Sequence, residues 1–117
     1  MAEPNIVIRE DGFELVEDEQ AIYRVRWADV REIYAVRVDL FAEDSLRLGF
    51  IVAGEFDAVE VDDHWPRFQE LAVELLHRFD GDQRLWMRFF DGQLDAEHTV
   101  LWTATRAKTE ATVGRGR

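Results

Sequence analysis

Cysteine is missing from this chain of 117 residues, and serine and lysine are almost missing, with Ser45 and Lys108 as the single examples. The absence of cysteine excludes disulfides, thiol nucleophiles and cysteine-ligated metal sites. Ser45 has no histidine and no glycine elbow beside it in the sequence, so nucleophilic catalysis has no well-placed candidate. We therefore expect a protein that is not an enzyme, with no catalytic residues, no metal ligands and no bound cofactor.

Long apolar stretches are also missing. Every apolar run is far shorter than the roughly 20 residues that a membrane-spanning helix needs, and no export signal is recognisable at the N-terminus. We expect a cytoplasmic protein. The length is that of one domain, which we assign to residues 1–106, and the basic segment 107–117 has no apolar period and is expected to be disordered.

Negative charge is the strongest signal in the composition. The chain has 25 acidic and 14 basic residues, which gives a net charge of -11. Such a chain repels nucleic-acid phosphates and anionic lipids, so we expect neither nucleic acid nor a membrane as a partner. The charge has two readings: it keeps a small protein in solution, or it attracts a basic protein partner by accelerating the encounter.

Alternating apolar residues predict β-strands along the first half of the chain. Two long strands, near residues 34–40 and 46–52, flank an acidic corner. The dipeptide Asp11-Gly12 lies between two short apolar runs and predicts a hairpin, because glycine supplies the positive φ that tight turns need. Further short strands are predicted near residues 5–9, 13–16, 21–27 and 59–61.

After these strands the apolar period changes from about two to about 3.6 and predicts one amphipathic helix over about residues 63–80. Asp63 is the expected N-cap, and Pro66 would lie in the first turn, where its missing N–H does no harm. We interpret Leu85–Phe90 as a strand. The apolar run 98–104 fits either a strand, by its threonine and valine content, or a helix, by the spacing of its large residues, and we favour the strand.

The predicted order of elements, several short strands and then one amphipathic helix, resembles that of bacterial pleckstrin-homology-like (PH-like) and GRAM-like domains. The likeness is carried by GFEL at 12–15, RVRWADVREI at 24–33, VRVDLFAEDSLRLGF at 36–50 and DDHWPRF at 62–68. The resemblance implies an α+β, mainly β fold. In such a fold an antiparallel sheet or partly open barrel of about six to seven strands is packed by one C-terminal helix, here followed by a short extra strand.

Acidic residues cluster at two points of the chain. Asp39, Glu43 and Asp44 surround the corner between the two long strands, and Asp62 and Asp63 precede the predicted helix. We interpret these five residues as the contacting face of a protein-binding domain. The chain also resembles small, stand-alone bacterial proteins, and this likeness suggests an immunity-type protein that masks a basic bacterial toxin.

Two alternatives stay open. Trp86, Phe90 and Trp102 could pair the subunits of a self-associating structural or adaptor protein, because interface cores favour aromatic residues. His64, next to the two aspartates that precede the helix, could bind a divalent metal and support an enzyme, although such a segment is also typical of a capped helix start.

Overall fold

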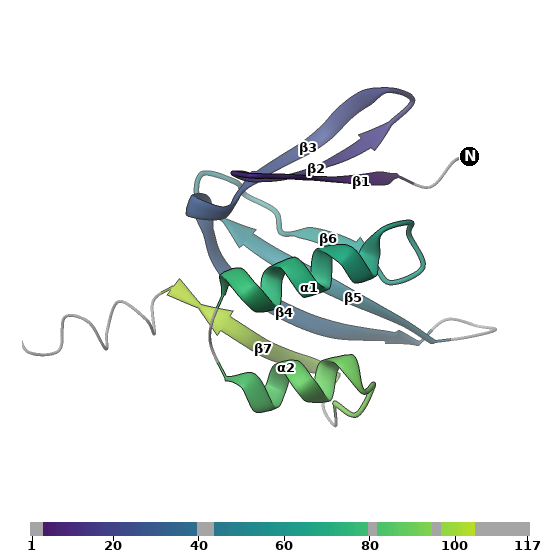
Figure 1. Cartoon of the computed structure of the whole chain (residues 1–117), viewed down its shortest axis with the longest axis vertical. Helices are drawn as coiled ribbons and strands as arrows, with labels where there is room; N and C mark the ends of the chain where they lie inside the picture. Colours follow the sequence, from purple (N-terminus) through teal and green to yellow (C-terminus); the bar gives the residue numbers. More distant parts are fainter. Residues whose placement is uncertain (1–3, 40–43, 80–81, 95–96, 105–117) are drawn as a thin grey trace, which may run out of the picture.

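The computed structural model of the chain describes residues 4–39, 44–79, 82–94 and 97–104. Within them, seven strands form two antiparallel sheets, and two α-helices follow the sixth strand and precede the seventh along the chain (Figure 1). The protein is therefore mainly β, as predicted. The strands are β1 (Asn5–Arg9), β2 (Gly12–Glu17), β3 (Gln20–Arg26), β4 (Val30–Asp39), β5 (Asp44–Val52), β6 (Val59–Asp62) and β7 (His98–Thr103).

The strands divide into a three-stranded sheet of order β1-β2-β3 and a four-stranded sheet of order β6-β5-β4-β7. A short 3-10 turn at Trp27–Asp29 carries the chain from the first sheet to the second. No ladder joins the two sheets within the described segments, so they do not form a closed barrel. The strand predicted over 98–104 is confirmed as β7, which pairs with β4.

The predicted hairpin at Asp11-Gly12 is confirmed, with Arg9 of β1 opposite Gly12 of β2. The reason for the glycine differs from the expected one, because Gly12 is not among the described glycines with a positive φ. Instead, a Cβ atom at this position would collide with the carbonyl oxygen of Val25 in the neighbouring strand β3. Glycine is needed here because two backbones approach each other closely.

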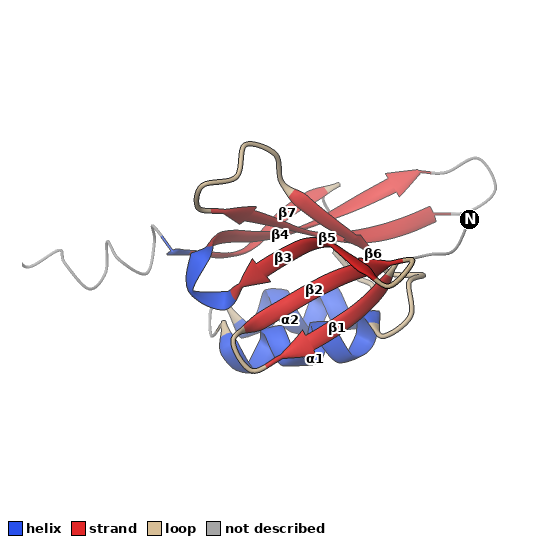
Figure 2. Ribbon diagram, turned by 90° about the horizontal axis from the view of Figure 1, so that it is seen from above, coloured by secondary structure: helices blue, strands red, loops and turns tan. Residues whose placement is uncertain are grey.

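Both helices lie on the same side of the four-stranded sheet (Figures 1 and 2). They are α1 (Phe68–Arg78) and α2 (Gln83–Phe90). Their apolar side chains and the inner faces of both sheets form one core. Its fully buried members include Ile6, Phe13, Leu15, Ile33, Leu48, Phe50, Val61, Leu71, Leu75 and Trp86.

The first helix is shorter than the predicted 63–80 and begins at Phe68. Asp63 is not its N-cap, because the Asp63 N–H donates to the carbonyl of Leu46 and keeps this residue tied to β5. Arg67 occupies the cap position with a left-handed φ of 69° and makes no capping hydrogen bond through its side chain. Because Asp63 pairs with the sheet, the helix begins about one turn later in the sequence than predicted.

The prediction of a strand at Leu85–Phe90 is wrong, since this segment lies in α2. Asp82 caps the helix by accepting a hydrogen bond from the Arg84 N–H at 3.0 Å. Trp86 and Phe89, three residues apart, are both buried, which is the spacing of one helix face. None of the described helices is long and apolar enough to cross a membrane.

Candidate functional site

The two acidic points of the sequence meet at one end of the four-stranded sheet. At this end β4 turns into β5, with Asp39 opposite Asp44. The neighbouring pairing of β5 with β6 sets Arg47 opposite Asp62, and β6 ends there. The hydroxyl of Ser45, one residue after Asp44, donates to Asp62 Oδ2 at 3.0 Å. We call the residues Asp39, Asp44, Asp62 and Asp63 the acidic end.

Four of the five predicted contact residues belong to the described part of the chain. Asp39 and Asp44 are placed by the backbone register of their strands. Glu43 lies outside the described residues. The side chains of Asp62 and Asp63 are 15% and 31% exposed, respectively. Asp63 is thus the more accessible of the two carboxylates.

Asp62 serves the local structure. Its Oδ1 accepts the backbone N–H of His64 at 2.8 Å, and its Oδ2 accepts the Ser45 hydroxyl. Arg47 Nε lies 3.7 Å from the same Oδ2. Partial burial opposes ionisation of Asp62, but the hydrogen bonds from His64 and Ser45 outweigh it and lower its pKa. The fold therefore stabilises the Asp62 carboxylate and uses it to hold the turn after β6.

Asp63 has the opposite electrostatic setting. Partial burial, together with the neighbouring charge of Asp62, raises the pKa of Asp63. Its Oδ1 is shielded from solvent and accepts no hydrogen bond from a described residue, although His64 Nδ1 lies 3.2 Å away. A backbone hydrogen bond from Leu46 and the nearby His64 act in the opposite direction and lower the pKa of Asp63, but by less than burial and Asp62 together raise it. This carboxylate is therefore only partly compensated within the protein.

Beside Asp63 the surface has a cavity of about 200 Å³. Asp63 forms part of its wall, and three phenylalanines, Phe68 of α1 and Phe89 and Phe90 at the end of α2, form another part. Phe68 and Phe89 are core residues, 3% and 4% exposed, and Phe90 is partly buried. A carboxylate beside an apolar wall suits a guanidinium or ammonium group, whose charge the carboxylate attracts and whose aliphatic stem can lie along the wall. The cavity depends on α2, so its aromatic wall could not be predicted while Leu85–Phe90 was interpreted as a strand.

A chain of polar contacts extends from the acidic end along the outer face of the four-stranded sheet. Arg47 Nη1 lies 3.6 Å from Glu60 Oε1, and the Tyr34 hydroxyl donates to Glu60 Oε2 at 2.7 Å. Burial, followed by the hydrogen bond to Glu60, raises the pKa of the Tyr34 hydroxyl, so it remains protonated and acts as the donor. The ring of Tyr34 stacks on His98, with ring centroids 4.7 Å apart. These contacts fix the outer face next to the acidic end.

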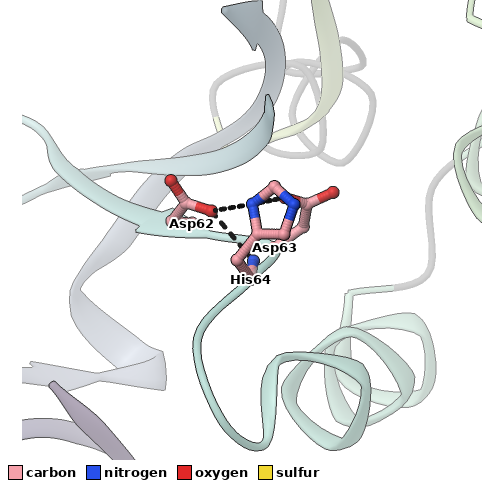
Figure 3. Close-up of side chains that lie close together, drawn as sticks. All are labelled: Asp62, Asp63 and His64. Carbon is pink, nitrogen blue, oxygen red and sulfur yellow. Dashed lines mark hydrogen bonds and ion pairs between the residues drawn. The ribbon is translucent and has the colours of Figure 1, made fainter. Parts of the chain in front are cut away.

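Asp62, Asp63 and His64 form the group of possible metal ligands in the described part of the chain. One ligand atom from each lies within 4.8 Å of the others, and Figure 3 shows the imidazole of His64 next to the two carboxylates. His64 Nδ1 is 3.1 Å from Asp62 Oδ1. Two carboxylates and an imidazole are suitable ligands for a divalent transition metal. The guanidinium of Arg47 at Asp62, however, already supplies one positive charge.

The aromatic residues predicted to pair subunits are all at least partly buried in the structure. Trp86 is completely buried, and Phe90 and Trp102 are partly buried and pack against the core. The large apolar side chains that are exposed in the described segments are different ones, which the sequence analysis did not select: Ile22, Tyr23, Ile51, Phe56, Val73 and Met87.

Comparisons of the chain with protein-family models, with curated proteins and with solved structures gave no match.

Proposed function

We propose that this protein is a non-enzymatic binding domain whose acidic end receives a basic side chain of a protein partner. The observation that carries the proposal is the position of Asp63, a partly compensated carboxylate in the wall of a cavity that Phe68, Phe89 and Phe90 also line. An arginine or lysine in this cavity would neutralise Asp63 and lay its aliphatic stem along the apolar wall. Interface energy is usually concentrated in such anchors.

The charge of the whole chain supports the same function. A net charge of -11 attracts a basic partner over distances of about a Debye length, near 8 Å at physiological ionic strength. Such attraction raises the association rate, and the acidic end would then fix the orientation. Asp39 and Asp44, which the strand register places at the same end of the sheet, would add to the local potential.

The finer form of the proposal is an immunity-type protein of PH-like architecture that masks a basic bacterial toxin. What supports it is the acidity of the chain and the order of six strands before the first helix. The two separate sheets would make the fold an open variant of the PH-like barrel.

The experiment is a capture from a lysate of the native host with three immobilised proteins: the wild type, Asp63→Asn, and Asp18→Asn as control. Asp18 lies in the β2–β3 turn, far along the chain from the acidic end, with a φ of 52° that asparagine also tolerates. Both variants lose one negative charge, so they differ only in where it is lost.

We expect the wild type and Asp18→Asn to retain a basic protein that moderate salt releases, and Asp63→Asn to bind it at least about tenfold more weakly. Equal binding by the two variants would show that net charge alone attracts the partner and that the cavity has no part in it. A partner that is not basic would contradict the proposal as a whole.

A second function, binding of a divalent metal, is favoured by one specific observation, the approach of ligand atoms from Asp62, Asp63 and His64 within 4.8 Å. We rank it below protein binding because Arg47 lies 3.7 Å from Asp62 Oδ2 and repels a further cation there. The test is thermal unfolding with added Zn²⁺ or Mn²⁺. A rise in the melting temperature that His64→Ala abolishes would support the metal site, and an unchanged melting temperature would reject it.

A further inference from the structure

Among the described residues that line the cavity beside Asp63, Asp63 itself is the charged one. The arginine nearest to it along the chain is Arg67, whose guanidinium lies 3.0 Å from a carboxylate oxygen of Glu70 in an ion pair on α1. His64 Nδ1 lies 3.2 Å from Asp63 Oδ1, but an imidazole is charged only when it is protonated. The described part of the chain therefore lines this acidic cavity with no arginine or lysine.

The basic residues of the chain are distributed unevenly along the sequence. Residues 1–104 contain ten basic and 24 acidic residues, whereas residues 105–117 contain four basic residues and one acidic residue. The segment 105–117 follows β7 and lies outside the described residues. Its charge is opposite to that of the acidic end, so the two parts of the chain attract each other.

The register of the strands gives the distance that this segment must cover. Thr103, at the end of β7, is opposite Glu32 of β4. Asp62, at the end of β6, is opposite Arg47 of β5, and Arg47 is opposite Val36 of β4. The two strand ends are therefore four residues apart along β4 and three strands apart across the sheet. This is about 14 Å in each direction, or about 20 Å in a straight line.

Figure 1 shows the same separation. Strand β7 ends at the left of the four-stranded sheet, whereas α1 begins at the right. The first residue of α1, Phe68, lines the cavity beside Asp63. A segment that continues from β7 must therefore pass from one end of the sheet to the other to reach the cavity.

The length of the segment divides its four basic residues into two pairs. Lys108 is four residues after Ala104, as far as about 14 Å when fully extended, and Arg106 is closer still, so neither reaches the cavity. Arg115 is eleven residues after Ala104 and reaches up to about 40 Å when extended. A flexible chain of eleven residues has a root-mean-square span of about 18 Å. Binding within one chain is strongest when this span matches the distance, as it does for Arg115 and its neighbour Arg117.

We propose that residues 105–117 bind the acidic end of their own chain, with an arginine of the pair Arg115 and Arg117 in the cavity beside Asp63. In this arrangement the guanidinium meets the Asp63 carboxylate, and the aliphatic stem lies along the apolar wall. Because the segment takes the place of the partner's basic side chain, this inference rests on the proposed function. The segment is then a competitor within the chain, which a basic partner must displace.

A spin label on the segment tests where it binds. The chain has no cysteine, so Gly116→Cys introduces a single labelling site between the two arginines of the full chain. We expect a nitroxide there to broaden the amide signals of Asp63, Phe68 and Phe90, and moderate salt to remove the effect. Asp63→Asn should also remove it, whereas Asp18→Asn, which loses the same charge elsewhere, should keep it. Broadening that arises only from a label on another copy would overturn binding within one chain.

Two double variants of the full chain test the predicted reach of the segment. One combines Arg115→Gln with Arg117→Gln, and the other combines Arg106→Gln with Lys108→Gln. Each removes two positive charges from the segment, so the two variants differ only in the distance of those charges from β7. We expect the variant at 115 and 117 to release the cavity, and the variant at 106 and 108 to behave as the wild type.

The probe is an acetylated and amidated peptide with the sequence of residues 114–117, Gly-Arg-Gly-Arg, which is titrated into each protein and followed by NMR shifts at Asp63. A flexible tether gives an effective concentration on the order of millimolar, so a competitor with a similar dissociation constant weakens the probe about threefold. We therefore expect the variant at 115 and 117 to bind the probe about threefold more tightly than the wild type does. Equal gains in the two double variants would overturn the assigned reach.

The remaining outcomes distinguish the docking of the segment from the proposed function. Equal binding of the probe at Asp63 in all three proteins, with no broadening by the spin label, would refute the docking and leave the proposed function intact. A probe that causes no shift at Asp63 in any of the three proteins would refute both, because the cavity would then accept no arginine.

Discussion

Gly49 and Tyr34 form a contact whose energy can be predicted from the structure. They are opposite each other on β5 and β4, and the ring of Tyr34 covers the glycine. A Cβ atom at position 49 would lie deep inside the van der Waals envelope of three ring carbons of Tyr34. Gly49→Ala must therefore displace the ring, which is only 7% exposed and cannot simply swing into solvent without breaking its other contacts.

The displaced ring loses two interactions, the stack on His98 with centroids 4.7 Å apart and the 2.7 Å hydrogen bond to Glu60. An aromatic pair contributes about 1 kcal/mol and a hydrogen bond at a partly exposed carboxylate about 1.5 kcal/mol. Replacing a strand glycine by alanine returns about 0.5 kcal/mol of backbone entropy. We expect a net loss of about 2 kcal/mol in the free energy of unfolding, and a decrease of about 8 °C in the melting temperature.

Urea denaturation followed by tryptophan fluorescence measures this loss, and a double-mutant cycle assigns it to the ring. In a Tyr34→Leu background, Gly49→Ala should change the free energy of unfolding by less than about 0.5 kcal/mol, which gives a coupling energy of about 1.5–2 kcal/mol. Additive effects of the two substitutions would refute the reasoning, because they would mean that the Cβ atom is accommodated without moving Tyr34.

Three further predictions concern single polar groups. Ser45→Ala should lower the free energy of unfolding by about 1–2 kcal/mol, because it removes a buried hydrogen bond to a carboxylate. The same substitution should raise the native-state pKa of Asp62, because the carboxylate loses a hydrogen bond. The free energy of unfolding of the variant should then fall less than that of the wild type as the pH falls through this pKa. Denaturation at several pH values measures the free energy, and NMR titration of the carboxyl carbon measures the pKa. Asp63→Asn should stabilise the free protein at pH 7, because the raised native pKa of Asp63 means that its ionisation costs stability as the pH rises. The gain should vanish in acid, where Asp63 is protonated. A variant that is less stable than the wild type at pH 7 would contradict this prediction. Asp82→Ala removes the N-cap of α2 and should cost about 1 kcal/mol, visible as faster amide exchange in α2 with α1 unchanged.

Much of the β-structure could be predicted from the sequence because alternation with period two is a local signal. The strands before the helices were predicted in this way and are confirmed. Leu85–Phe90 was predicted wrongly because a run of six residues fits a buried strand as well as a short helix. What distinguishes them is the cap at Asp82 and the common burial of Trp86 and Phe89.

The candidate site was predictable only in part. Acidic residues at two points of the chain were visible in the sequence, but their meeting at one end of a sheet depends on the register of β4, β5 and β6. The cavity beside Asp63 needed α2 in its place. The hydrogen bond from the Asp63 N–H to Leu46, which prevents Asp63 from capping the helix, joins residues far apart in the sequence and has no local signal.

The opposite pKa directions of Asp62 and Asp63 have a thermodynamic consequence for the binding proposed above. A basic side chain that approaches Asp63 lowers the pKa of that carboxyl, so any fraction still protonated in the free protein releases its proton when the complex forms. In the proposed complex, binding would be linked to pH through one residue, and calorimetry in buffers of different ionisation enthalpy would register the released protons. Asp62, already held as a carboxylate by its neighbours, contributes almost none of them.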